Sequence, residues 1–524
     1  KDDRAAGRFT RLEESWAQHT RYIEQAQEKT ATLQGEAMRT LAEGIALEGP
    51  RIVVFNPLPW PRDGVARMKW AGKSPSALRS VEGQTIVPAV MDGDEFCFAA
   101  RGIPAMGYRA FVPAEMVKPA NDLRGDSEAG IIENEFFRVT LDRERCGIRS
   151  VVDKRANREL VDPDSSYALG QYLYERFDAD QVAAYVKAYV KTDADWAQAE
   201  LGKPAMPPTG EVPYRAASPR SGAIRIDQTA MSVAAAMHAP STPDMPHATT
   251  TRVILYAGEP FIDLEATLHD KPADDWPEAG WICLPVNADE PQFRLGRLGG
   301  VADPARDFVR GSNHDVQAIH TGLTITDRQG RGVGICPLDN PLVSLDQPGL
   351  FRYSPDFVPR KPAAFVNLFN NQWTTNFRLW NEGTWTARVR LWSVDRFDTQ
   401  ASLITPSLEA RYPLLAAACE GKAGTLPLEA TGLELSSRGT LVTAFGPNPD
   451  GPGIVLRLWE YAGMSGPCRV HLPKTLDAQS VQPVNLRGEP TGAPLPVKAS
   501  EFTVNLAAFA PSSFVISKPM KGSL

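Results

Sequence analysis

The segment IVVFNPLPWPRDG, residues 52–64, marks the point where the expected fold changes from helix to β structure. Its β-branched residues predict a strand, and the Pro-rich corner and the Asp-Gly turn that follow are typical of the start of a β-domain. Before this segment, apolar residues recur at alternating steps of three and four from residue 4 to about residue 46. That spacing predicts one long amphipathic helix.

The predicted helix carries its apolar residues in a single stripe. The stripe consists of Phe9, Leu12, Trp16, His19, Ile23, Ala26, Thr30, Leu33, Ala37 and Leu41. A lone amphipathic helix gains little stability in water, so the stripe needs partner helices. No second helix pattern of comparable length follows in the sequence. We therefore expect the partner helices to lie outside this chain, and self-association is the alternative.

After residue 50 the chain consists of short strand patterns separated by turns rich in Gly, Asp and Pro. We expect four parts: a long helix at 1–49, a small β-domain at 50–119, a large β-domain at 126–402 and a C-terminal β-sandwich at 403–524. Several domains are expected because 524 residues exceed what one hydrophobic core accommodates. The predicted fold class is mainly β, built from stacked sandwiches.

Composition excludes some kinds of partner. The formal net charge of −7, without a basic tail or stripe, indicates no nucleic acid. No apolar run approaches the roughly 18 residues that span a bilayer, so we expect no membrane partner. The start KDDRAAGRF has no signal-peptide pattern and suggests a cut inside a longer protein. Six scattered cysteines without CxxC or metal-ligand spacing predict buried free thiols and favour a cytoplasmic location.

Five segments, in order, resemble the C-terminal half of glycoside hydrolase family 38, the α-mannosidases. They are IVVFNPLPWPR (52–62), NEFFRVTLDRERCGIRSVVDKRANREL (134–160), HDKPADDWPEAGW (269–281), VQAIHTGLTITD with GVGICPLDNP (316–341) and GIVLRLWEYAG (453–463). The resemblance implies that the large β-domain is a supersandwich like that of galactose mutarotase, flanked by smaller β-sandwiches. It also implies that the long helix is the last helix of a three-helix bundle.

The resemblance further implies a glycan or mannoside substrate and upstream catalytic and helical-bundle domains. The family's chemistry needs a divalent metal, usually zinc, held by a His-x-Asp pair, a further His and an Asp that is also the nucleophile. No His-x-Asp spacing occurs among the seven histidines of this chain. We therefore expect the zinc in a catalytic domain outside this chain, and no catalytic residue or metal ligand within it.

The segment at residues 365–385 gathers amide and aromatic side chains. Its candidate substrate contacts are Asn370, Asn371, Trp373, Asn376 and Trp380. Sugars are bound by amides, which both donate and accept hydrogen bonds, and by aromatic rings that cover apolar sugar faces. The alternative is a buried network, in which the Asn side chains bond strand-end backbone and the Trp rings lie in the core.

A Gly-interrupted loop within residues 294–320 supplies two further candidates, Arg310 and His314. They offer a cationic donor and a titratable imidazole that could reach a neighbouring catalytic pocket. The alternative is a surface loop of weak salt bridges.

Glu175 is a potential acid or base in the strand pattern QYLYERF, residues 171–177. Alternation places it on the opposite face from Tyr172 and Tyr174. Catalysis would need a partner carboxylate, and none is identifiable, so a solvated or salt-bridged Glu175 is expected. The nearby DDWPE, residues 274–278, is interpreted as a turn.

Two functional hypotheses follow. The first is the accessory half of a retaining α-mannosidase-like glycoside hydrolase, inactive alone, which shapes the substrate cleft and braces an upstream catalytic domain. The second is a non-catalytic carbohydrate-binding or structural β-module. A third hypothesis gives the supersandwich lyase or epimerase chemistry of its own, which requires an acid–base pair in its groove.

Overall fold

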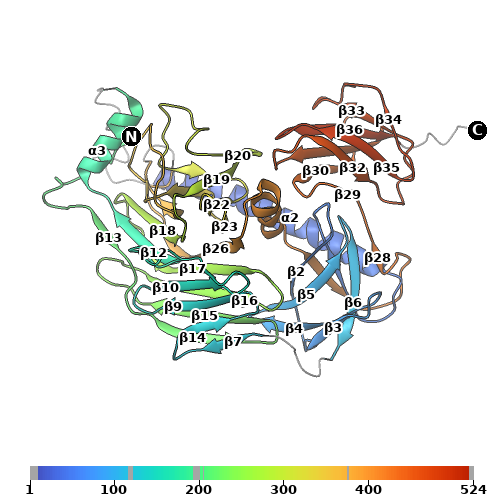
Figure 1. The fold of residues 1–524 in the computed structure, drawn as a ribbon, viewed down its shortest axis with the longest axis horizontal. Helices are drawn as coiled ribbons and strands as arrows, with labels where there is room; N and C mark the ends of the chain where they lie inside the picture. Colours follow the sequence, from blue (N-terminus) through green and yellow to red (C-terminus); the bar gives the residue numbers. More distant parts are fainter. Residues whose placement is uncertain (1–9, 116–121, 193–200, 204–205, 374–376, 518–524) are drawn as a thin grey trace, which may run out of the picture.

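The computed structural model describes residues 10–115, 122–192, 201–203, 206–373 and 377–517. The chain forms a first β-domain, a large supersandwich and a C-terminal sandwich, together with one long helix (Figure 1). The predicted fold class, mainly β with stacked sandwiches and a long N-terminal helix, is confirmed. The six cysteines are free and five of them are buried, as predicted.

Helix α2 (Thr10–Gly44) forms within the range that the apolar stripe predicts. Burial is confined to its two ends, where Trp16 lies near the first and Met38 and Ala42 near the second. Between them the stripe is open to solvent in the described part of the chain, with Ile23 72% and Leu33 67% exposed. The partner helices that would cover this stripe stay a prediction.

The first β-domain is an eight-stranded sheet. Its strands are β1 (Arg51–Phe55), β2 (Arg62–Lys69), β3 (Ala77–Ser80), β4 (Ile86–Asp92), β5 (Glu95–Ile103), β6 (Tyr108–Ala114), β27 (Leu415–Cys419) and β28 (Glu429–Ala430), in the order β1-β27-β2-β5-β4-β3-β6-β28. Strands β27 and β28 come from beyond the predicted boundary at residue 403. Sheet membership therefore does not follow that boundary, because the chain returns to pair with β1 after crossing the supersandwich.

The largest sheet of the supersandwich has nine strands. Its order is β14 (Ala223–Gln228), β15 (Ser232–Ala239), β16 (Ala248–Tyr256), β17 (Phe261–Lys271), β26 (Gly383–Val394), β23 (Gly332–Pro337), β22 (Leu323–Thr326), β19 (Gln292–Arg297) and β20 (Gly300–Ala302). Strand β17 alternates along its length: Ile262 and Leu264 are buried, and Asp263 and Glu265 are half-buried on the other face. That alternation presents a charged outer surface and an apolar inner one.

A six-stranded and a five-stranded sheet complete the supersandwich. The six-stranded sheet is β13 (Arg215–Ala217), β12 (Gln171–Arg176), β18 (Glu278–Pro285), β25 (Ala363–Asn370), β24 (Leu342–Leu345) and β21 (Gln317–Ala318); the five-stranded sheet is β11 (Arg158–Glu159), β10 (Gly147–Asp153), β9 (Phe137–Asp142), β8 (Ile131–Glu133) and β7 (Arg124–Asp126). Residues from all three sheets share one hydrophobic core. The outer face of the six-stranded sheet carries a second core under helix α3 (Ala179–Val190).

The chain leaves the supersandwich through a π-helical turn (Thr399–Ile404) and the short helix α5 (Thr405–Arg411). The C-terminal sandwich then packs a three-stranded against a five-stranded sheet around its own core. Its strands are β29 (Glu434–Leu435), β32 (Gly466–His471) and β35 (Glu501–Leu506), and β30 (Thr440–Pro447), β31 (Ile454–Glu460), β36 (Pro511–Ser517), β33 (Ser480–Val484) and β34 (Leu495–Pro496).

Candidate functional site

Two loops cross between the six-stranded and nine-stranded sheets at one end of the supersandwich. Residues 272–277 connect β17 to β18, and residues 371–382 connect β25 to β26. We call them the crossing loops. Asn370 pairs with Ala279 and Lys271 with Gly383, so the two loops begin and end side by side. The second crossing loop contains most of the contact residues predicted from the sequence.

A buried ion pair joins the two sheets beneath these loops. The Lys271 ammonium donates to Glu278 Oε1 at 2.5 Å, and both side chains are almost fully inaccessible. The Tyr174 hydroxyl donates to the other carboxylate oxygen at 2.5 Å. Burial raises the pKa of Glu278, while Lys271 and Tyr174 oppose that rise. The interpretation of Glu278 as part of a turn is wrong: it is the first residue of β18.

Asn371 is a structural residue of this site. Its Oδ1 accepts from the Glu278 backbone N–H at 2.8 Å, and its Nδ2 donates to three backbone carbonyls, those of Trp276 at 2.7 Å, Leu379 at 3.0 Å and Asp274 at 3.3 Å. It is 1% exposed. These bonds tie one crossing loop to the other, as in the buried network that the sequence left open as an alternative.

The remaining amides show a similar pattern. Asn370 is half-buried and donates to Asn367 Oδ1 at 2.8 Å, while its carbonyl accepts from Asn381 Nδ2 at 3.2 Å. The Asn381 carbonyl in turn accepts from Lys271 at 2.9 Å. Asn376 lies outside the described residues. Lys271 therefore holds both the Glu278 carboxylate and the backbone at Asn381, near the end of the second crossing loop.

Trp373 belongs to a group of four aromatic rings beside helix α3. We call this the aromatic group; it consists of Tyr185, Tyr189, Tyr353 and Trp373. The Trp373 ring lies edge-on to Tyr189 and Tyr185, with centroids at 5.0 and 5.9 Å, and Tyr189 lies edge-on to Tyr353 at 6.3 Å. Tyr185 is buried, but Tyr189 is 46% exposed. The group offers a partly accessible aromatic surface next to the second crossing loop.

Helix α3 presents two members of the aromatic group because its spacing places them one turn apart. Tyr185 and Tyr189 are at positions i and i+4, and their rings are nearly parallel, with an angle of 17°. Asp178 caps the helix through a capping box with Gln181, and Lys191 closes its C-terminal end. The sequence analysis missed Tyr189, although its helical spacing from Tyr185 was a usable signal.

Trp380 contacts the long helix. Its ring lies edge-on to Trp16 of α2, with centroids 5.1 Å apart and an interplanar angle of 89°. Trp380 is half-buried and Trp16 is 7% exposed. The second crossing loop is therefore braced by a residue of the N-terminal helix.

The loop that contains Arg310 and His314 reaches the aromatic group through Tyr353, whose hydroxyl donates to the Gly311 carbonyl at 2.7 Å. Arg310 is exposed. The His314 imidazole lies between the carbonyls of Phe357 and Val309, at 3.1 and 3.2 Å. The structure thus brings this loop to the same side of the supersandwich as Trp373, and a role in substrate contact stays a prediction for both residues.

The expected solvation of Glu175 is wrong. Glu175 is 5% exposed and accepts from the Tyr214 hydroxyl and the Trp281 indole, each at 2.7 Å. Burial raises the pKa of Glu175, and the two hydrogen bonds oppose the rise. The predicted alternation is confirmed, since Tyr172 and Tyr174 lie in the shared core on the other side of the strand.

His247 is a further buried polar residue that the sequence did not reveal. It is 1% exposed, and its Nε2 lies 2.9 Å from the Tyr172 hydroxyl. Its Nδ1 has no hydrogen-bond partner among the described residues. Burial, aided by Lys271, lowers the pKa of His247 to about 4. Because His247 and Glu278 are both enclosed in the core, they do not form the open acid–base pair that the lyase hypothesis requires.

Within the described ranges, no three His, Cys, Asp or Glu side chains are grouped so that they could hold a metal ion. The described residues therefore do not provide the ligand set for the zinc that the resemblance implies. We assign no catalytic step to them. None of the described helices is long and apolar enough to cross a lipid bilayer.

Comparison with known proteins supports the resemblance. Residues 440–510, most of the C-terminal sandwich, match the family described as "Glycosyl hydrolases family 38 C-terminal beta sandwich domain". The crystal structure of an alpha-mannosidase from Enterococcus faecalis V583 is similar to this chain with a TM-score of 0.67 and 13% identity, over 94% of this chain and 59% of that one. No curated protein sequence matches.

A second solved structure, a protein in the glycosyl hydrolase family 38 from Enterococcus faecalis, gives the same TM-score of 0.67 and 13% identity, over 94% of this chain and 62% of its own length. This chain therefore spans about 60% of the solved structures that it matches. At this identity the likeness establishes the fold. The predicted resemblance to the C-terminal region of family 38 α-mannosidases is confirmed.

Proposed function

We propose that this chain is the carbohydrate-associated C-terminal region of a retaining α-mannosidase-like glycoside hydrolase. In this proposal it shapes the substrate cleft and braces a catalytic domain that precedes these residues. The fold shared with the Enterococcus faecalis alpha-mannosidase and the family match of residues 440–510 support the assignment. The single observation that carries the role in the cleft is the tethering of Asn371 and Asn381, in the described parts of the second crossing loop, beside the aromatic group.

The aromatic group suits a sugar because pyranose rings have apolar faces that cover aromatic rings well. Trp373 and Tyr189 form its accessible part. The loop that carries Trp373 is held by Asn371, which is itself fixed to the first residue of β18. A contact surface that is ordered before binding loses less conformational entropy when the ligand arrives, so the tether favours affinity.

The bracing role is supported by helix α2. At 35 residues the helix is about 50 Å long. One end packs on the first β-domain through Ala42, and the other contacts the second crossing loop through Trp16. Its exposed central stripe, with Ile23 and Leu33, is the surface that a helical domain would cover.

The test measures hydrolysis of an aryl α-mannoside by the 524-residue chain, alone and mixed with a catalytic domain encoded upstream in the same gene. The chain alone should be inactive even with added zinc. The mixture should be active and sensitive to a chelator, and Trp373→Ala or Tyr189→Ala in this chain should raise KM more than it lowers kcat.

Phe509→Ala is the matched control, because Phe509 is a partly exposed aromatic residue of the C-terminal sandwich. It should leave KM unchanged. Chelator-sensitive turnover by the chain alone would overturn the proposal. Glycan binding that is unaffected by the catalytic domain, with no gain of activity on mixing, would favour the second hypothesis, a carbohydrate-binding or structural β-module.

A further inference from the structure

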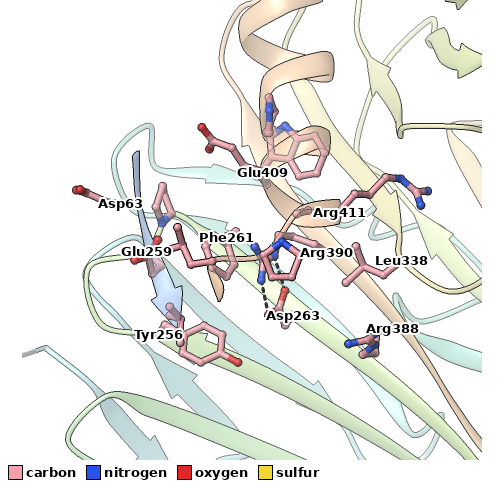
Figure 2. A pocket seen from close by; sticks show the side chains of 18 of the residues that line it. Asp63, Tyr256, Glu259, Phe261, Asp263, Leu338, Arg388, Arg390, Glu409 and Arg411 are labelled. Atoms are coloured by element: carbon pink, nitrogen blue, oxygen red, sulfur yellow. Dashed lines mark hydrogen bonds and ion pairs between the residues drawn. The ribbon is translucent and has the colours of Figure 1, made fainter. Parts of the chain in front are cut away.

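A cavity of about 600 Å³ lies where the first β-domain, the supersandwich and helix α5 meet. Figure 2 shows its side chains. One side is the outer surface of β17 and β26, and the others are the start of β2 and residues 401–414. Three parts of the fold that are distant in sequence therefore enclose one volume.

The cavity is distinct from the crossing loops. It is lined by Asp263 and Glu265 near the start of β17, whereas Lys271 ends the same strand beneath the crossing loops. Asp263 and Lys271 are eight positions apart along β17, which corresponds to at most about 26 Å for an extended strand. A ligand in the cavity would not touch the aromatic group at the same time unless it were an extended chain.

Charged side chains line the cavity in equal numbers. Six arginines, among them Arg62, Arg388, Arg390 and Arg411, face six carboxylates, among them Asp263 and Glu409. At neutral pH the six positive and six negative groups balance. The lining therefore has a high density of hydrogen-bonding groups without a net charge.

The ion pair at the centre of Figure 2 is bidentate. Arg390 donates from Nε and Nη2 to the two carboxylate oxygens of Asp263, at 2.7 and 2.8 Å. Arg388, two residues earlier on β26, binds Asp339 in the same way at 3.0 and 2.7 Å. A guanidinium has five N–H donors and a carboxylate about four acceptor sites, so the Asp263–Arg390 pair keeps donors and acceptors for a ligand, and Arg388 keeps donors.

The arginines of the opposite wall are also occupied, but by neutral acceptors. Arg62 donates to Asn56 Oδ1 and to the Glu409 carbonyl, each at 3.0 Å, and Arg411 to the carbonyls of Thr321 and Pro337 at 2.6 and 2.7 Å. Burial lowers the pKa of Arg62 to about 10, and Glu409 opposes that change. An anionic ligand would have to compete with these existing bonds and with the neighbouring carboxylates.

Apolar surface lies between the charged groups. Phe261, Leu338, Trp392 and Leu414 line the same volume, and the Arg390 guanidinium lies 3.6 Å from the centre of the Phe261 ring. A ligand that fits must present hydroxyl groups to the ion pairs and C–H faces to these side chains. Cavities of roughly 300–1,000 Å³ accommodate small molecules, and this one falls in that range.

We propose that this cavity binds a neutral oligosaccharide of two or three sugar units, at a second carbohydrate site separate from the crossing loops. Its vicinal hydroxyls bridge guanidinium donors and carboxylate acceptors of the Asp263–Arg390 pair and its neighbours, while its apolar faces lie on Phe261 and Leu338. The balance of charge selects neutral sugars over phosphorylated or acidic ones.

The experiment is calorimetric titration of the 524-residue chain with α-mannobiose as the neutral probe and mannose 6-phosphate as the anionic one. Ala401→Trp is the main variant, because Ala401 lines the cavity with an exposed side chain and an indole there takes up part of its volume without removing a contact. It should weaken α-mannobiose binding at least tenfold. Arg388→Met, which removes half-exposed donors, should do the same to a smaller degree.

Two controls separate this site from the crossing loops. Ala507→Trp, at an exposed alanine of the C-terminal sandwich, should leave binding unchanged. Trp373→Ala alters the proposed site at the aromatic group and should leave α-mannobiose binding in the cavity intact. Thermal unfolding of each variant checks that it is folded. The proposal is overturned if α-mannobiose does not bind, if neither cavity variant weakens it, if Trp373→Ala alone abolishes it, or if mannose 6-phosphate binds more tightly.

Discussion

The indole of Trp16 packs edge-on against the indole of Trp380, with ring centroids 5.1 Å apart. This contact joins the N-terminal helix to the second crossing loop, which carries the predicted sugar-contact residues. The other end of the helix packs against β1 and β27 of the first β-domain. Helix α2 therefore contacts both the first β-domain and the loop region of the supersandwich.

Replacing Trp16 by Ala should loosen the first half of helix α2, because Trp16 is its buried residue there. The edge-on ring pair and the lost burial together predict a cost of roughly 1 to 3 kcal/mol. Hydrogen exchange of residues 10–30 should increase, and exchange near Ala42 should change less. Ile23→Ala is the control: at 72% exposure it should change stability by less than about 0.5 kcal/mol.

Replacing Lys271 by Met should be strongly destabilising, because it leaves Glu278 buried without its cationic partner. Loss of one member of a buried pair costs roughly 3 to 5 kcal/mol. The double variant Lys271→Met with Glu278→Gln should recover part of this loss, and urea unfolding followed by fluorescence measures both. As a control, Arg378→Ala removes the half-exposed Arg378–Glu382 pair of the second crossing loop and should cost less than about 1 kcal/mol.

The Asn371→Asp variant should disorder the second crossing loop. A carboxylate oxygen would replace the amide nitrogen that donates to three carbonyls, which predicts a cost of about 2 kcal/mol or more. Limited proteolysis should then cut within residues 377–382 faster than in the wild type. Asn370→Asp is the control, because Asn370 is half-buried and its amide group donates a single hydrogen bond. Equal cleavage of both variants would contradict the tethering role.

We expect the folded protein to lose stability in mild acid because His247 is buried. Its pKa falls from the usual 6.5 to about 4 in the folded protein, so below pH 6.5 the unfolded chain takes up a proton that the folded chain resists. The stability contributed by this residue is therefore present above pH 6.5 and falls by up to about 3 kcal/mol as the pH approaches 4.

Comparing the wild type with His247→Gln isolates this effect, since the other titrating groups are common to both. As the pH falls from 6.5 to 4, the unfolding free energy of the wild type should decrease relative to that of the variant. A constant difference over that range would show that His247 is protonated in the fold or accessible to water.

Local periodicity in the sequence predicted the long helix and the faces of the strands, but the prediction of strands alone after residue 50 was wrong for helix α3. The spacing of three and four predicted helix α2, and alternation correctly separated Tyr172 and Tyr174 from Glu175. Composition also located the amide and aromatic segment at 365–385, although it did not reveal that Asn371 is buried. Periodicity shows which face of an element is apolar, because it depends only on residues a few positions apart.

Only the tertiary structure decided which faces meet. It paired Lys271 with Glu278 and Trp16 with Trp380, and it carried β27 and β28 back to the first sheet. It also brought β2, β17, β26 and α5 around one cavity. These contacts join residues that are far apart along the chain, and their energies depend on burial and on distance in space, which no local pattern encodes.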